Sequence, residues 1–214
     1  AELHVALPRC TAGDVKLFRA GFAPDAPASA ETFGRMTETA HLVFTSAGSG
    51  AAFANSKLMH ATNQTDSYRM LIHPGPCVIP AALAAAELGG SDGRQLITAL
   101  AAAYEVEARI AGDFIPTTQA RGFRSSPVYG TFGAAVATGM LIGLDQDQMV
   151  TALALACTFT GGTTEGPRGS GREMMYHEPN ATRNGIMAAL LARENLRGSE
   201  LALEWEAGFY NAFT

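Results

Sequence analysis

The sequence has no surplus of positive charge and no long apolar run, and each absence excludes a class of partner. Its 20 Asp and Glu residues outnumber the 15 Lys and Arg residues, which leaves a formal net charge of −5. Nucleic-acid-binding proteins normally show a basic surplus, so we expect no nucleic-acid partner. The longest apolar run, near residues 96–103, is interrupted by Thr98 and is too short to span a bilayer. We therefore expect no membrane partner either.

Cysteine is also scarce, and the three cysteines lie far apart in the sequence, at Cys10, Cys77 and Cys157. An odd number of cysteines without a CxxC pair argues against a disulfide scaffold. No set of His, Asp and Cys has the spacing of metal ligands, so we expect no metal ion and no cofactor. The start of the sequence lacks the basic residues and apolar middle of a signal peptide. A cytoplasmic location is the resulting expectation.

What the sequence has in abundance is apolar residues at helical spacing. Hydrophobic residues make up 47% of the 214 residues and charged residues only 16%, which is typical of a folded domain with a substantial core. No segment alternates in the manner of a strand. The glycine pair Gly89-Gly90 and the capping residues Asp92 and Asp145 mark helix ends. We predict an all-α fold, a helical bundle with helices at residues 51–59, 81–88, 94–110, 131–142, 146–157 and 180–194.

Three long polar segments separate these helices, at residues 63–80, 112–130 and 161–179, and each contains several prolines or glycines. We predict that all three are irregular loops. Helical scaffolds place much of their chemistry on such loops, so candidate functional residues are sought there. Residues 1–50 are broken by prolines and glycines and are the least readable part of the sequence.

A series of short motifs runs from residue 51 to residue 213. They occur at 52–55, His60, Asp66, 73–75, 78–82, 103–106, 128–135, 143–145, Met149, His177, 185–186 and 190–194. Each motif is weak by itself, but together their order and spacing resemble the MmgE/PrpD family. That family includes 2-methylcitrate dehydratase, cis-aconitate decarboxylase and enzymes similar to iminodisuccinate epimerase.

The resemblance implies how the chain is organised. In the family a large all-α domain is followed by a smaller α+β domain, and this sequence ends near 208–213, where the junction is expected. We therefore expect a poorly matched segment at 1–50, packed on an MmgE/PrpD-like helical domain at 51–214 that lacks the α+β domain. Because the helical domain forms the dimer contact in the family, we expect a homodimer or a partner chain that carries the missing domain.

The resemblance also implies a function. The family's enzymes act on small di- or tricarboxylates as lyases or isomerases of the dehydratase, decarboxylase or epimerase type. Such chemistry needs cations that hold the carboxylates and a group that moves one proton near neutral pH, for which histidine is suited. Two alternatives stay open. In the first, the chain is a catalytically degenerate partner or regulatory subunit of an active relative. In the second, it is a helical domain without a functional site.

The first polar segment carries most of the implied catalytic residues. His73 stands in the His-Pro context of the family's catalytic histidine. Asn63 occupies the position of an aspartate that assists this histidine, Asp66 matches a second acidic position, and Ser67 stands where threonine is usual. His60, near the end of the preceding helix, is a candidate substrate-binding residue. The alternatives are ordinary turn residues for the polar groups and a structural role for the histidines.

The other two segments depart further from the family. Arg124 stands where a histidine is frequent, and with Arg121 it is a candidate for binding carboxylates through the guanidinium groups. His177 is retained as a candidate catalytic residue, whereas Met174 stands where the family carries a lysine. Arg168 is a candidate for the lost charge, in a glycine-rich loop whose backbone N–H groups suit an anion. Solvated surface positions are the alternative for these arginines. The departures from the family indicate a changed substrate, a changed reaction or lost chemistry.

Overall fold

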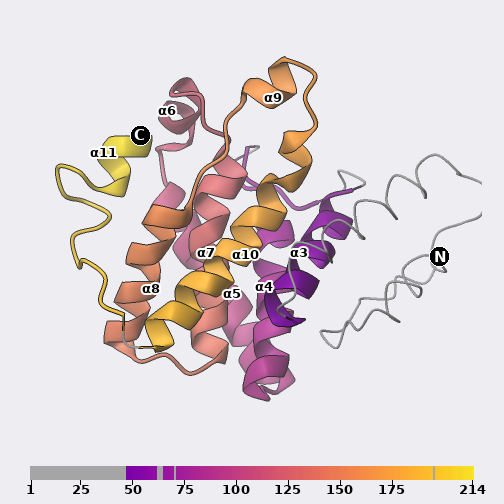
Figure 1. Cartoon of the computed structure of the whole chain (residues 1–214), viewed down its shortest axis with the longest axis vertical. Helices are drawn as coiled ribbons and strands as arrows, with labels where there is room; N and C mark the ends of the chain where they lie inside the picture. Colours follow the sequence, from indigo (N-terminus) through magenta and orange to yellow (C-terminus); the bar gives the residue numbers. More distant parts are fainter. Residues whose placement is uncertain (1–46, 62–64, 70, 195) are drawn as a thin grey trace, which may run out of the picture.

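The computed structural model describes residues 47–61, 65–69, 71–194 and 196–214 (Figure 1). Within these ranges the chain is helical and has no β-strand, only two isolated bridges, so the predicted all-α fold is confirmed. The predicted segment 1–50 lies outside the described residues except for 47–50. The helices are α3 (Ala47–His60), α4 (Pro74–Gly89), α5 (Gly93–Ala111), α6 (Ile115–Ala120), α7 (Ser125–Leu141), α8 (Gln146–Phe159), α9 (Glu165–Arg168), the 3-10 helix η1 (Glu173–Tyr176), α10 (His177–Arg193) and α11 (Phe209–Phe213).

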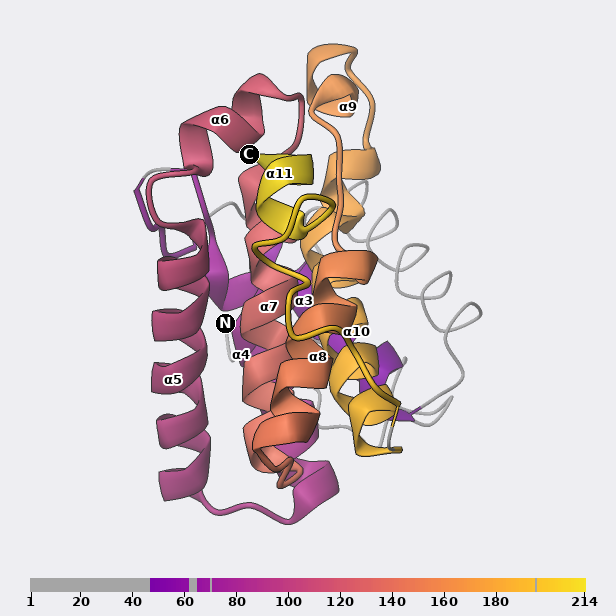
Figure 2. The same cartoon turned by 90° about the vertical axis from the view of Figure 1, so that its left-hand side faces the viewer.

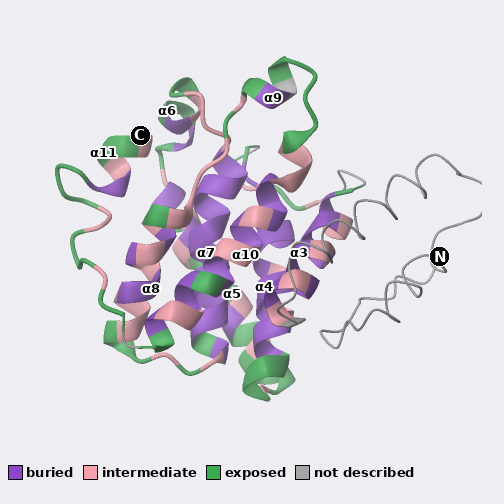
Figure 3. Ribbon diagram, viewed as in Figure 1, coloured by how far each residue is buried: buried purple, intermediate pink, exposed green. Residues whose placement is uncertain are grey.

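Helix α7 forms the centre of the bundle. It packs against α4, α5, α8 and α10, and all of its residues except Met140 are buried. A helix that is covered on all sides needs no polar face, which is why α7 carries small and apolar residues around its whole circumference. Figure 2 shows α5 on one side of α7 and α10 on the other. Figure 3 shows the buried residues gathered around α7.

A glycine allows α10 to lie directly against α7. A Cβ atom at Gly185 of α10 would lie 2.5 Å from the Cβ atom of Ala134 and 2.7 Å from the backbone oxygen of Thr131. These distances are well inside van der Waals contact, so the two helices approach this closely only because residue 185 has no side chain. The close packing of α10 on α7 brings the N-terminal ends of the two helices together.

The predicted helix ends agree with the structure to within two residues, but four of the predicted helix starts do not. Helix α3 begins at Ala47 rather than at residue 51. The other three, α4 at Pro74, α7 at Ser125 and α10 at His177, also begin earlier than predicted. The prediction of irregular loops at 63–80, 112–130 and 161–179 is therefore wrong for the last part of each segment. In addition, α6 forms inside the second segment, and α9 and η1 form inside the third. The cause of the early starts of α4, α7 and α10 is proline in the first helical turn, where the backbone N–H has no acceptor to lose. These prolines are Pro74, Pro76, Pro127 and Pro179.

The predicted helix caps are confirmed. The side chains of Asp92 and Asp145 accept hydrogen bonds from the backbone N–H groups of Gln95 and Gln148, and both pairs form complete capping boxes. Gly90 ends α4 with a φ of 64°, in the left-handed region that favours glycine. These local signals determine where α5 and α8 begin and where α4 ends.

Candidate functional site

Three candidate residues lie at the N-terminal ends of three helices of the bundle. His73 directly precedes α4, Arg124 directly precedes α7, and His177 is the first residue of α10. The backbone N–H of His73 donates to Oγ of Ser126 over 3.1 Å, which ties the start of α4 to the first turn of α7. The first turn of a helix leaves N–H groups without intrahelical acceptors, so a place where such turns meet favours negative charge.

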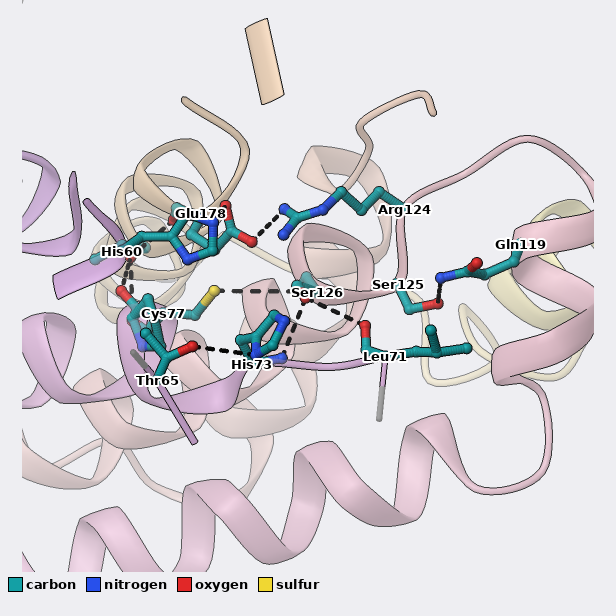
Figure 4. A network of polar contacts seen from close by, with 12 residues as sticks. His60, Thr65, Leu71, His73, Cys77, Gln119, Arg124, Ser125, Ser126 and Glu178 are labelled. Carbon is teal, nitrogen blue, oxygen red and sulfur yellow. Dashed lines mark hydrogen bonds and ion pairs between the residues drawn. The ribbon is translucent and has the colours of Figure 1, made fainter. Parts of the chain in front are cut away.

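The His73 ring is held in one orientation by the segment that precedes it. Its Nδ1 atom lies 2.8 Å from the backbone oxygen of Asp66. The same atom lies 3.1 Å from Oγ1 of Thr65 (Figure 4). A backbone carbonyl only accepts hydrogen bonds, so Nδ1 carries a hydrogen and donates a hydrogen bond to the backbone oxygen of Asp66. The neutral ring then has its free electron pair on Nε2. His73 is thereby oriented as a base through Nε2.

The Asp66 carboxylate fixes the loop against the start of α4. It accepts hydrogen bonds from the backbone N–H of Gly75, at 3.0 and 3.1 Å, and from the hydroxyl of Tyr104 at 2.7 Å. A Cβ atom at Gly75 would lie only 2.7 Å from the carboxylate, so a glycine is needed at this contact. Asp66 therefore positions His73 through its backbone oxygen, while its carboxylate anchors the loop.

Arg124 forms an ion pair with a residue that sequence analysis did not consider, Glu178 in the first turn of α10. The Arg124 Nη1 atom donates to Oε1 of Glu178, and the two side chains are 12% and 0% exposed. The other carboxylate oxygen, Oε2, lies 3.8 Å from Nε2 of His60, whose ring centroid is 5.9 Å from that of His73. Figure 4 shows His73, His60, Glu178 and Arg124 as neighbouring side chains from four segments of the chain.

Burial favours the neutral form of His60. It lowers the pKa of the imidazole below its ordinary value, Glu178 opposes this shift, and the neighbouring residues Arg124, His73 and Lys57 lower the pKa further. Burial also lowers the pKa of Lys57, again opposed by Glu178. The contact between His60 and Glu178 is therefore one between a neutral ring and a carboxylate, and the main cation bound to Glu178 is Arg124.

His177 directly precedes Glu178 in α10 and lines a cavity. It is 9% exposed, and burial, with a further contribution from Arg124, lowers its pKa. The cavity has a volume of about 210 Å³ and lies between α7, α8 and the first turns of α10, with polar residues Thr160, Asn180 and Asn184 in its lining. Neither His73 nor Arg124 is among its lining residues, so the cavity is separate from the cluster formed by His73, His60, Glu178 and Arg124.

Comparison with known proteins decides the family. The sequence matches the family model described as MmgE/PrpD N-terminal domain over residues 28–214. The chain belongs to the MmgE/PrpD family. The match begins at residue 28, ahead of residue 51, where the recognisable motifs start.

Relatives of known name are MmgE/PrpD proteins that are considerably longer than this chain. The human protein named cis-aconitate decarboxylase is 31% identical over 169 residues, which are 74% of this chain and 34% of the relative. Cis-aconitate decarboxylase of Aspergillus terreus is 31% identical over 172 residues, 77% of this chain and 35% of the relative. The cis-aconitate decarboxylase-like protein oryM of Aspergillus oryzae is 29% identical over 174 residues, 77% and 36% of the two chains. The chain thus spans about a third of the length of the curated relatives it matches.

The remaining residues that the MmgE/PrpD resemblance singled out lie elsewhere. Ser67 is exposed, and Arg168 is exposed on the short helix α9. Arg121 is exposed and its Nη1 atom donates to the backbone oxygen of Ala212 over 3.4 Å. Within the described residues, no hydrogen bond or ion pair joins these three side chains to His73 or Glu178. Asn63 lies outside the described residues.

Glu178 is the residue of this candidate site that the sequence prediction missed. A signal was available, because an acidic residue directly after His177 falls in the first turn of a helix, where the helix dipole favours it. The pairing of Glu178 with Arg124 could not be predicted from the sequence, because the two residues are 54 positions apart. The described part of the chain holds no group of three or more His, Cys, Asp and Glu residues arranged to bind a metal ion. In the same residues, no helix has the length and apolarity that crossing a membrane requires.

Proposed function

We propose that this chain forms the helical part of an enzyme that moves a proton on a small di- or tricarboxylate, with His73 as the proton carrier. The observation that carries the proposal is the hydrogen bond from Nδ1 of His73 to the backbone oxygen of Asp66, which leaves Nε2 as the base. Membership of the MmgE/PrpD family and relatives named cis-aconitate decarboxylase support a substrate of this class.

The proposed role is the same in each of the family's reactions. In a dehydration the base removes a proton from the carbon next to a carboxylate, and the hydroxyl group on the adjacent carbon leaves with a proton as water. In an epimerisation the base removes such a proton and a proton returns to the opposite face of the carbon. In a decarboxylation carbon dioxide leaves, its bonding electrons stay on the carbon, and that carbon accepts a proton from the conjugate acid. His60, which lies 3.8 Å from Glu178, and His177, which precedes Glu178 in α10, belong to the proposed surroundings of the substrate. A second copy of the chain or an α+β domain is proposed to complete the site. We also propose a cytoplasmic location for the protein.

A catalytically degenerate partner is the second candidate function. The observation in its favour is that Arg124, expected to hold a substrate carboxylate, is paired with Glu178, while Met174 stands where a lysine was expected. A protein that only binds a relative would have no use for a base oriented as His73 is. Proton exchange therefore separates the two functions.

The test uses the complete protein in deuterium oxide with a panel of di- and tricarboxylates, followed by proton NMR. Exchange or conversion of one substrate is expected, and His73→Gln should slow it by about 10²–10⁴-fold, the usual effect of losing a general base. Arg69→Gln is the matched control, because Arg69 lies in the same segment and pairs with Asp113 at the surface. Normal exchange by His73→Gln would remove His73 from the mechanism. Absence of exchange with every substrate would favour the degenerate partner.

A further inference from the structure

The Glu178 carboxylate is completely buried among the groups that a substrate carboxylate would need. Oε1 accepts a hydrogen bond from the Arg124 guanidinium, and Oε2 faces Nε2 of His60 at 3.8 Å. Oε2 has no hydrogen-bond partner among the described residues. The charge of Glu178 also raises the pKa values of Lys57 and His177, against the effect of their burial.

We propose that Glu178 is an internal carboxylate that occupies Arg124 and so determines substrate specificity. The site then takes a dicarboxylate in preference to a tricarboxylate. This inference rests on the proposed function, because it names the substrate class of the same site. Glu178 acts as a specificity-determining residue, and Arg124 holds a carboxylate of the protein rather than one of the substrate.

Both partners of the ion pair are attached to fixed helix starts. The backbone N–H of Arg124 donates to the carbonyl of Gly162 over 2.9 Å. In α10, Oγ1 of Thr182 donates to the backbone oxygen of Glu178 at 2.9 Å and lies 3.1 Å from the backbone oxygen of Pro76. The first turn of α10 is thereby joined to α4. An external carboxylate would have to displace a partner that is already desolvated and in place, which disfavours the exchange.

The charges around Glu178 also favour a substrate with fewer carboxylates. Burial lowers the pKa values of Lys57, His60 and His177 and so disfavours their charged forms, which leaves Arg124 as the main cation beside Glu178. The ion pair with Glu178 cancels the charge of Arg124, which is then not available to a substrate carboxylate. A further substrate carboxylate placed near Oε2 would meet a like charge, so Glu178 both removes an attraction and adds a repulsion.

The first experiment measures whether Arg124 is open to external carboxylates, and it needs no catalysis. Glu178→Ala leaves a space opposite the buried guanidinium. Formate or acetate should raise the melting temperature of this variant in a saturable manner, compared with chloride at equal ionic strength, and should leave the wild-type chain unchanged. Glu87→Ala is the control, because Glu87 is an exposed carboxylate on α4. If Glu178→Ala does not fold, Glu178→Ser, which also leaves a space opposite the guanidinium, takes its place with the same expectation.

Two results of this experiment would overturn the proposal. One is stabilisation of the wild-type chain by formate to the same degree as the variant, because Arg124 would then be free. The other is a variant that folds but does not respond to formate or acetate, because the vacated position would then not be a carboxylate position. Neither result depends on proton exchange, so failure of the proposed function and failure of this inference are distinguishable.

The second experiment measures specificity in the complete protein. Succinate and propane-1,2,3-tricarboxylate are compared as ligands by calorimetry. Wild type should bind the dicarboxylate more tightly than the tricarboxylate. In Glu178→Gln the ratio of the two dissociation constants should shift in favour of the tricarboxylate by about tenfold or more, which corresponds to the free energy of one charged hydrogen bond. An unchanged ratio in a folded variant would show that Glu178 does not select the substrate.

Discussion

Glu107 offers a stability test of the fold that needs no substrate. Its side chain lies between α5 and α7, is 1% exposed, and neither carboxyl oxygen has a hydrogen-bond partner among the described residues. A Cβ atom at Gly133 would lie 2.3 Å from Oε2, so the carboxyl group fills a space that this glycine leaves in α7. Burial, with a smaller contribution from Asp66, raises the pKa of Glu107 from 4.5 to about 8. Glu107 is therefore protonated in the folded chain at neutral pH.

The magnitude follows from the two pKa values. Between pH 4.5 and about 8 the folded chain binds one more proton at Glu107 than the unfolded chain does. The free energy of unfolding therefore decreases as the pH rises, by about 1.4 kcal/mol per pH unit from this group alone, and levels off above the folded pKa. At neutral pH the accumulated loss is on the order of 3 kcal/mol relative to acidic solution. Glu107→Gln keeps the shape of the side chain and removes this slope.

The assay is urea unfolding of the chain, followed by far-UV circular dichroism at several pH values between about 5 and 8. The difference in unfolding free energy, Glu107→Gln minus wild type, should increase by about 1.4 kcal/mol per pH unit. Glu105→Gln is the matched control, since Glu105 is exposed on the same helix and bonded to Arg109. Equal slopes for wild type and Glu107→Gln would refute the reasoning, because they would mean that Glu107 is ionised in the folded chain.

Two further changes test the packing and the caps by the same unfolding assay. Gly185→Ala forces a Cβ atom to 2.5 Å from that of Ala134, so we expect a loss of about 1–3 kcal/mol, whereas Gly93→Ala, which meets nothing within 4 Å, should not destabilise the chain. Equal effects of the two substitutions would contradict the close contact of α10 and α7. Asp145→Ala removes the capping box with Gln148 and should lower the unfolding free energy by about 1 kcal/mol, and an unchanged midpoint would mean that the cap contributes nothing.

Local signals in the sequence were sufficient for the fold class and for most helix ends. Asp92 and Asp145 cap the helices that they were predicted to cap, and Gly90 ends α4 in a conformation that favours glycine. These features depend on residues within one or two turns of each other, so the sequence contains all the information that they need. Helix starts were harder because proline is equally common in loops and in first turns, and Pro74 and Pro127 proved to be of the second kind.

The side-chain partners in the site depended on tertiary structure. The resemblance to the family singled out His73 and Arg124 from their motifs, but it did not include Glu178, which binds Arg124 only because α10 packs closely on α7 at Gly185. The same holds for Glu105 and Glu107, which differ by two positions and hence point to opposite faces of α5. One is exposed and the other is buried against α7. Sequence by itself determined which residues are ionisable. Packing between helices that are distant in the sequence decided which of these ionisable side chains are buried away from water. Burial changes the pKa of such a side chain and makes a charged side chain require a partner of opposite charge.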